Sequence, residues 1–216
     1  MNDDLTVDAA TVNATLDEVI RRRRSCRAFT EEAPPREAIA AVLEAGMFAP
    51  YAALAVAGRP DFRRFFVIEG SSEAMAQVRG LVEAHGRRTA DGLERKGADD
   101  PAFGKRVAPF IDRLRAATLP RCPWLVVVAE LNGFPPVAPQ SLAHVVQNMW
   151  LKSTALGLGL QLLSVFESMS ANEALLGLLG LEAGAYSLAG CAIVYPAQAL
   201  PPAVRPDTAA ATVWLG

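Results

Sequence analysis

The stretch RRRRSCRAF, residues 21–29, places five guanidinium groups and one hydroxyl within seven residues at the end of a predicted helix. A helix C-terminus carries partial negative charge and therefore favours cations. One interpretation is thus a solvated basic helix end or a patch that binds nucleic acid, and composition alone favours it. The other interpretation is a phosphate site, because arginine presents forked donors that match phosphate oxygens and Ser25 adds a hydroxyl donor.

The composition fits one large domain with a substantial core. Of the 216 residues, 51% are hydrophobic and 20% are charged, which excludes a disordered chain. The net charge of -2 gives no overall attraction to nucleic acid or to an anionic membrane. Three distant cysteines without CxxC spacing, and the isolated His85 and His144, argue against a metal site. Without a membrane-spanning apolar run or signal peptide, we expect a cytoplasmic protein.

Hydrophobic periodicity predicts long helices and short strands along the chain. The predicted helices span residues 16–23, 36–48, 72–93, 102–119, 140–156 and 171–179. The predicted strands span residues 64–68, 124–129, 188–195 and 212–215. We expect residues 1–14 to form a flexible tail and residues 15–216 a single domain with a helical insertion at about 71–121. Short strands separated by long helices indicate an α+β or α/β class.

Four segments, in order along the chain, resemble the nitroreductase (flavin reductase) family. They are RRSCRAF (23–29), LEAGMFAP (43–50), HVVQNMWLKSTALGLGLQLLS (144–164) and LEAGAYSLAGCAIVYP (181–196). They are similar to the family's N-terminal signature, its helix leading into Ala-Pro, its central helix and its penultimate strand. The resemblance implies an α+β fold with a mixed, mostly antiparallel central sheet flanked by helices. It also implies an intertwined homodimer with the central helix at the interface.

The resemblance implies FMN as the cofactor and assigns its phosphate and ribityl contacts to the N-terminal signature. These contacts are Arg23, Arg24, Ser25 and Arg27, whereas Arg21 and Arg22 fall outside the motif and are expected to be solvated. Arg205 stands where the family commonly has a Lys-x-Arg that closes over the phosphate, and Ala203 occupies the lysine position. Cys26 lies inside the basic motif, where cations could lower its pKa.

Contacts to the flavin ring are implied at two further places. The segment 164–168 lies where the family places a loop whose backbone N–H reaches flavin N5, and Glu167 and Ser168 are the candidates. From the residues alone, both equally suit a helix cap. Pro50 and Tyr51 begin the loop that contacts the ring in the family. Here Tyr51, Leu54 and Val56 replace the family's Ser, Asn and Gln, so polar recognition of the ring edge must come from elsewhere.

The resemblance implies an FMN-dependent oxidoreductase with a ping-pong mechanism. NAD(P)H would reduce FMN at N5, and a nitroaromatic, a quinone or a similar small acceptor would then enter the same cleft, with no essential side-chain acid or base. The expected partners are NAD(P)H, the acceptor and a second copy of the chain, rather than nucleic acid or a membrane. Two alternatives stay open: a specialised flavoenzyme that dehalogenates, oxidises a peptide or fragments the flavin, and a non-enzymatic module that binds nucleic acid.

Overall fold

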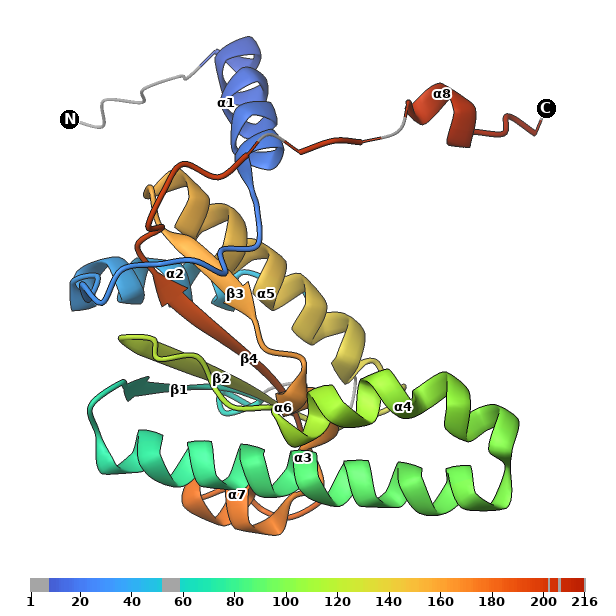
Figure 1. Ribbon diagram of the computed structural model, residues 1–216. Coiled ribbons are helices and arrows are strands. Elements are labelled where there is room, and N and C mark those ends of the chain that lie inside the picture. The colour runs from blue at the N-terminus through green and yellow to red at the C-terminus, as the bar shows by residue number, and fades with distance from the viewer. Residues whose placement is uncertain (1–7, 52–58, 202, 206, 216) are drawn as a thin grey trace.

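The computed structural model describes residues 8–51, 59–201, 203–205 and 207–215, and its elements are labelled in Figure 1. The helices are α1 (Ala9–Arg22), α2 (Arg36–Met47), α3 (Glu73–Asp99), α4 (Pro101–Arg115), α5 (Ala138–Ala155), α6 (Val165–Ser168), α7 (Glu173–Leu178) and α8 (Thr208–Ala211). The strands are β1 (Arg63–Glu69), β2 (Trp124–Leu131), β3 (Gly159–Leu162) and β4 (Tyr186–Val194).

The four strands form one antiparallel sheet in the order β1-β2-β4-β3. The segment that carries the basic motif runs along the outer side of β3. There Ser25 forms a parallel bridge with Leu160, and the Cys26 backbone N–H donates to the Leu160 carbonyl at 3.1 Å. The α+β class and the mostly antiparallel sheet are therefore confirmed.

Helices cover both faces of the sheet, and Figure 1 shows it between two helical layers. On β2, Val126 and Val128 face α2 and α5, whereas Leu125 and Val127 face α3, α6 and α7. Both sets of side chains are fully buried. This strand is buried on both sides, which explains its unbroken apolar sequence.

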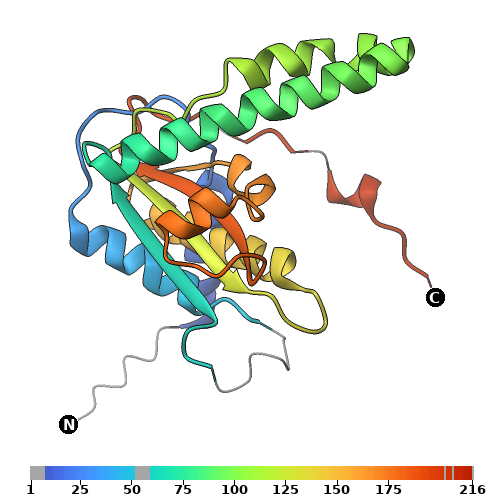
Figure 2. The same cartoon turned by 90° about the horizontal axis from the view of Figure 1, so that it is seen from below.

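Helices α3 and α4 form a long antiparallel pair that extends beyond the body of the molecule in Figure 2. Ser72 caps α3, because its hydroxyl accepts from the Met75 N–H at 3.1 Å. Asp100 caps α4 in the same way, and Pro101 occupies the first turn, where its missing N–H is tolerated. Among the described residues, no helix is both long and apolar enough to cross a membrane.

The structure differs from the sequence predictions in three places. Helix α1 begins at Ala9, so the second part of the expected tail is helical, while residues 1–7 lie outside the described chain. Strand β3 lies where no strand was predicted, because four residues are too few to give a periodic signal. The predicted strand 212–215 is wrong. These apolar residues follow α8 as an exposed tail, with Trp214 91% exposed, and pair with no strand of the described chain.

Gly190 of β4 allows the α6 turn to pack against the sheet. A Cβ atom at this position would lie 2.1 Å from Cδ2 of Phe166, whose ring is fully buried. We expect Gly190→Ala to lower the free energy of unfolding by about 1–3 kcal/mol, because the extra methyl overpacks the core. Urea unfolding followed by circular dichroism measures the change.

Gly177→Ala is the matched control. A Cβ atom at Gly177 of α7 meets no atom within 4 Å, so the substitution should be neutral or stabilising by up to about 1 kcal/mol. Equal stabilities for the two variants would contradict the packing role of Gly190.

Candidate functional site

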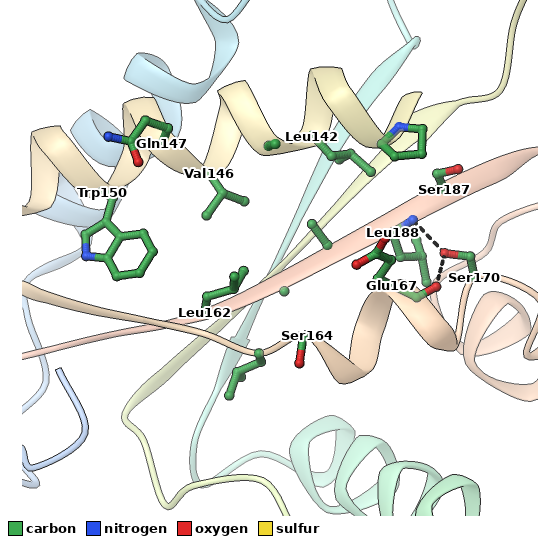
Figure 3. A pocket seen from close by; sticks show the side chains of 15 residues that line it. Leu142, Val146, Gln147, Trp150, Leu162, Ser164, Glu167, Ser170, Ser187 and Leu188 are labelled. Atoms are coloured by element: carbon green, nitrogen blue, oxygen red, sulfur yellow. Dashed lines mark hydrogen bonds between the residues drawn. The ribbon is translucent and has the colours of Figure 1, made fainter. Parts of the chain in front are cut away.

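A pocket of about 530 Å³ lies between α5, the segment from β3 to α6, and β4. Figure 3 shows Leu142, Val146 and Trp150 on the α5 side, with Leu162 and Leu188 on the strand side. The volume falls in the usual range for small-molecule sites, and mostly apolar walls are typical of them.

One stripe of α5 connects this pocket with a second hollow. Leu142, Val146 and Trp150 line the first pocket, and Thr154, one turn further on, lines a hollow of about 730 Å³. Four residues that recur at every fourth position share one helix face and cover about 18 Å of its length. The two hollows therefore follow one another along α5. The second is bordered by Arg21, Arg22 and Arg205.

Arg23 lies beside Trp150 of the first pocket, and its charge interacts with that of Arg205, which borders the second hollow. The Arg23 guanidinium lies 4.5 Å from the Trp150 ring centroid, and the Trp150 indole N–H donates to the Arg24 carbonyl at 3.1 Å. Burial lowers the pKa of Arg23, and the neighbouring charges of Arg205 and Arg24 lower it further. Like charges gathered in this way favour an anion as their ligand.

The other residues of the basic segment have distinct environments. Arg21 and Arg22 form exposed ion pairs with Asp17 (3.1 Å) and Glu18 (3.7 Å), which agrees with the expected solvated position. Ser25 is half-buried, Arg27 is exposed, and Arg24 is half-buried.

The expectation that cations lower the pKa of Cys26 is wrong, because burial raises it. The thiol is fully buried and donates to the Ala28 carbonyl at 3.4 Å. It also packs on Gly159, where a Cβ atom would lie 2.6 Å from Cys26 Sγ. Cys26 therefore fixes the basic segment against β3.

Glu167 and Ser168, adjacent in α6, differ in their surroundings. Glu167 lines the 530 Å³ pocket, whereas Ser168 is not among its lining residues. The Ser168 hydroxyl donates to the Val165 carbonyl at 2.8 Å and lies 2.9 Å from Nε2 of His85 on α3. Burial, and then the charge of Arg88, lower the pKa of His85. The Ser168 side chain thus joins α6 to α3.

Pro50 and Tyr51 lie away from this pocket, at the end of β2. The Tyr51 ring stacks on Phe62 with centroids 5.4 Å apart and an interplanar angle of 18°. The Tyr51 hydroxyl donates to the Leu131 carbonyl at 2.5 Å. Leu54 and Val56 lie outside the described residues. Within one chain, the structure does not bring Pro50 and Tyr51 together with the residues around Trp150.

Sequence reasoning missed a buried ion pair between Arg63 of β1 and Glu130 of β2. Arg63 Nε lies 2.5 Å from Glu130 Oε1, and both side chains are inaccessible to solvent. Arg63 Nη1 also donates to three carbonyls at the end of α2, those of Gly46 (2.9 Å), Met47 (3.1 Å) and Ala49 (3.1 Å). Arg63 Nη2 donates to the Ser141 hydroxyl at 3.2 Å. The signal in the sequence was a charged residue at the end of each of two apolar strands.

The Glu130 carboxylate is buried, and its hydrogen bonds and the charge of Arg63 offset part of the cost of burying it. Burial raises the pKa of Glu130, and the bonds from Ser141 and Arg63 act in the opposite direction. Glu130 Oε2 has no hydrogen-bond partner among the described residues. The stability of the pair therefore depends on the bonds around Oε1. Nowhere in the described chain do three His, Cys, Asp or Glu side chains group so as to hold a metal ion.

Comparison with known proteins places this geometry in a family. The model of the Nitroreductase family matches residues 20–194, which include the basic segment, α5, α6 and β4. No curated protein matches the sequence.

Solved structures are similar over nearly the whole chain. A candidate nitroreductase from Desulfovibrio desulfuricans, solved in complex with FMN, is 26% identical, with a TM-score of 0.63 over 93% of this chain and 96% of that one. An FMN- and NADPH-dependent nitroreductase from sphigopyxis sp. strain HMH is 21% identical, with a TM-score of 0.62 and coverages of 93% and 99%. An iodotyrosine deiodinase bound to FMN and 3-iodo-L-tyrosine is 19% identical, with a TM-score of 0.63 and coverages of 89% and 95%. The latter two likenesses show the fold alone.

The buried pair predicts a large loss of stability when one partner is removed. Arg63→Met leaves the Glu130 carboxylate buried without its cation, so the free energy of unfolding should fall by about 3–5 kcal/mol. Arg63→Met combined with Glu130→Gln should cost less than the sum of the two single changes, because neither variant side chain carries a charge. Urea unfolding of all three variants gives the coupling.

Arg64→Met serves as the control, since Arg64 is the next residue in β1 and lies over the Phe66 ring without an ion pair to another described residue. It should change stability by less than about 1 kcal/mol. Similar losses for Arg63→Met and Arg64→Met, or strict additivity in the double variant, would refute the importance of the pair.

Proposed function

The chain belongs to the nitroreductase family, and we propose that it is an FMN-dependent oxidoreductase. Its reaction is the ping-pong transfer of a hydride from NAD(P)H to a nitroaromatic, a quinone or a similar small acceptor. The observation that carries the proposal lies beside the apolar pocket, where Arg23 stacks over Trp150 and its charge interacts with that of Arg205. Arg23 and Arg205 are 182 positions apart in the sequence.

The described residues fit FMN in both charge and shape. Arg23 and Arg205, with Arg24, Ser25 and Arg27 in the same segment, would hold the phosphate and ribityl chain through charge-assisted hydrogen bonds. The apolar pocket beside Trp150 would take the ring. When bound, FMN would supply hydride transfer at N5, which no side chain can provide.

The chain's own residues would bind and orient FMN and would shield its ring from water. Val146, Trp150 and Leu188 would exclude water from the ring. The α6 turn, with the backbone of Glu167 and Ser168, would border the reacting edge. The Arg23 guanidinium, held over Trp150, would orient the phosphate end of the cofactor. We assign no acid or base step to a side chain.

A homodimer is part of the proposal. Val12, Leu16 and Ile20 form an apolar stripe on α1 that is about half exposed, and Phe48 at the end of α2 is 80% exposed. A groove of about 570 Å³ between α1, α2 and α5 lies beneath this surface. Exposed apolar surface of this kind favours burial against another protein. A second copy would also bring its own Pro50 and Tyr51 to the flavin site, which they do not reach within one chain.

Removal of these two cations should release the flavin. Arg23→Ala with Arg205→Ala deletes two charge-assisted contacts, each worth roughly 1.5–3 kcal/mol, so the FMN dissociation constant should rise by about 100-fold or more. The absorption spectrum of the purified protein and a fluorescence titration with FMN measure the loss.

Arg21→Ala with Arg22→Ala is the control, because it removes two arginines of the same segment that are paired with exposed carboxylates. Both arginines border the second hollow, but their charges are already paired, so the FMN affinity should fall much less than in the Arg23/Arg205 variant. Undiminished affinity in the Arg23/Arg205 variant would overturn the phosphate assignment. A colourless protein that takes up no FMN and binds DNA in a salt-dependent manner would instead support the nucleic-acid alternative.

The apolar stripe predicts a charge-sensitive dimer. Leu16→Glu places a carboxylate in the middle of this surface, and its burial without a partner is unfavourable. Sedimentation equilibrium should show a rise of about tenfold or more in the dimer dissociation constant, with weaker retention of FMN. Leu178→Glu on α7, a partly exposed leucine in the other helical layer, should leave assembly unchanged. A monomeric unsubstituted protein that retains FMN would contradict the two-chain site.

A further inference from the structure

Glu167 is the single charged side chain among the described residues that line the 530 Å³ pocket. Figure 3 shows it on the α6 side, across the pocket from Trp150 and near Leu188. The remaining lining residues are apolar or carry neutral hydroxyl or amide groups. The charge that a ligand meets at this end of the pocket is therefore set by one carboxylate.

The carboxylate of Glu167 is available to a ligand. Within the described chain it has no ion pair and no side-chain hydrogen bond. The neighbouring hydroxyls are engaged with protein groups: Ser170 donates to the Glu167 carbonyl at 2.8 Å, and Ser187 donates to Asn132 Oδ1 at 2.7 Å. Ser170 also accepts from the Leu188 N–H at 3.0 Å. The hydroxyl of Ser164, which also lines the pocket, makes no side-chain hydrogen bond within the described chain but is neutral, so Glu167 is the charged acceptor at this end.

The backbone that carries Glu167 is held in place by packing and hydrogen bonds. The Phe166 ring is fully buried against Gly190, which leaves no room for a side chain there. The Glu167 carbonyl accepts from both the N–H (3.2 Å) and the hydroxyl (2.8 Å) of Ser170. The carboxylate therefore projects from a fixed turn, and a ligand meets it at a defined place.

The two ends of the site carry opposite charge. Arg23 lies over Trp150 at one end, where the charge of Arg205 also acts on it, and Glu167 lines the other end. Glu167 is exposed to solvent, so its charge acts on a ligand group mainly through direct contact. A carboxylate on the ligand is repelled there, and a cation or an N–H donor is attracted.

We propose that Glu167 determines the charge of the acceptors that this protein accepts. Aromatic acceptors with an amidinium, ammonium or amide substituent are favoured, and those with a carboxylate are disfavoured. This inference rests on the proposed function, because it takes the acceptor to enter the same pocket as the flavin ring. Glu167 acts as a specificity-determining residue, and the balance of the redox reaction is unchanged by it.

The test uses three ligands that share a benzene ring and differ in charge: benzamidinium, benzamide and benzoate. Isothermal titration calorimetry on the protein as purified measures each dissociation constant. We expect the order of affinity benzamidinium, benzamide, benzoate, with a benzoate-to-benzamidinium ratio of dissociation constants of about three- to tenfold, as for other exposed carboxylates. Glu167→Gln should bring this ratio close to one, and Glu167→Asp should preserve the order. Raising the ionic strength should also reduce the ratio.

Glu173→Gln is the matched control, since Glu173 is an exposed carboxylate at the start of α7 outside the pocket lining. It should leave the ratio unchanged. The 4-nitro derivatives of the three ligands, used as acceptors with NAD(P)H, should show the same order in kcat/KM. A preference for benzoate, or a ratio that Glu167→Gln does not alter, would overturn the inference.

The proposed function can fail separately. A protein without bound flavin and without turnover of 4-nitrobenzamide would contradict the oxidoreductase proposal, while calorimetry would still report the charge preference of the pocket. A flavin-containing, active protein with no charge preference would contradict only the role of Glu167.

Discussion

The buried contact between Arg63 and Glu130 is the constraint on which the rest of the structure depends. It joins β1 to β2 at paired positions of the sheet, and the same guanidinium binds the carbonyls that end α2. Ser141 connects the pair to the first turn of α5. Because charges are costly to bury without partners, these groups are stable only in this arrangement. One side chain thereby sets the relative position of the sheet and of the two helices that cover one face.

Helix α5 transmits this constraint to the candidate site. Its Val145 and Met149 side chains are fully buried in the core, whereas Val146 and Trp150 also face the pocket. A helix with two adjacent functional stripes holds the pocket wall rigidly, since any rotation would expose its core stripe. The same helix also positions the Arg23 guanidinium, because that group lies over the Trp150 ring. The position of the proposed phosphate site therefore follows from core packing.

The sequence was sufficient for those features that depend on neighbours along the chain. Apolar runs predicted β1, β2 and β4, and periodic apolar positions predicted the long helices. The four ordered motifs predicted the family, and the match of the Nitroreductase family model over residues 20–194 confirms it. Features formed by distant residues were missed. Strand β3 is too short for a pattern, and the Arg63–Glu130 pair spans 67 positions. The same limit applies within one motif. The sequence shows the arginines next to Cys26, but it does not show that the thiol is buried, and burial raises its pKa. The assignments of FMN contacts remain predictions.

Because Phe166 packs on Gly190, the backbone conformation of the α6 turn does not depend on which side chain stands at position 167. The turn is fixed from beneath by an aromatic ring that fills the space above a glycine, so its geometry does not rely on the polar side chain that follows. The residue at position 167 can therefore change its charge or length while the backbone beside it stays in place. A scaffold built in this way can acquire new acceptor preferences through single substitutions, at little risk to folding. Divergence of function within one fold is then a matter of small, separable steps.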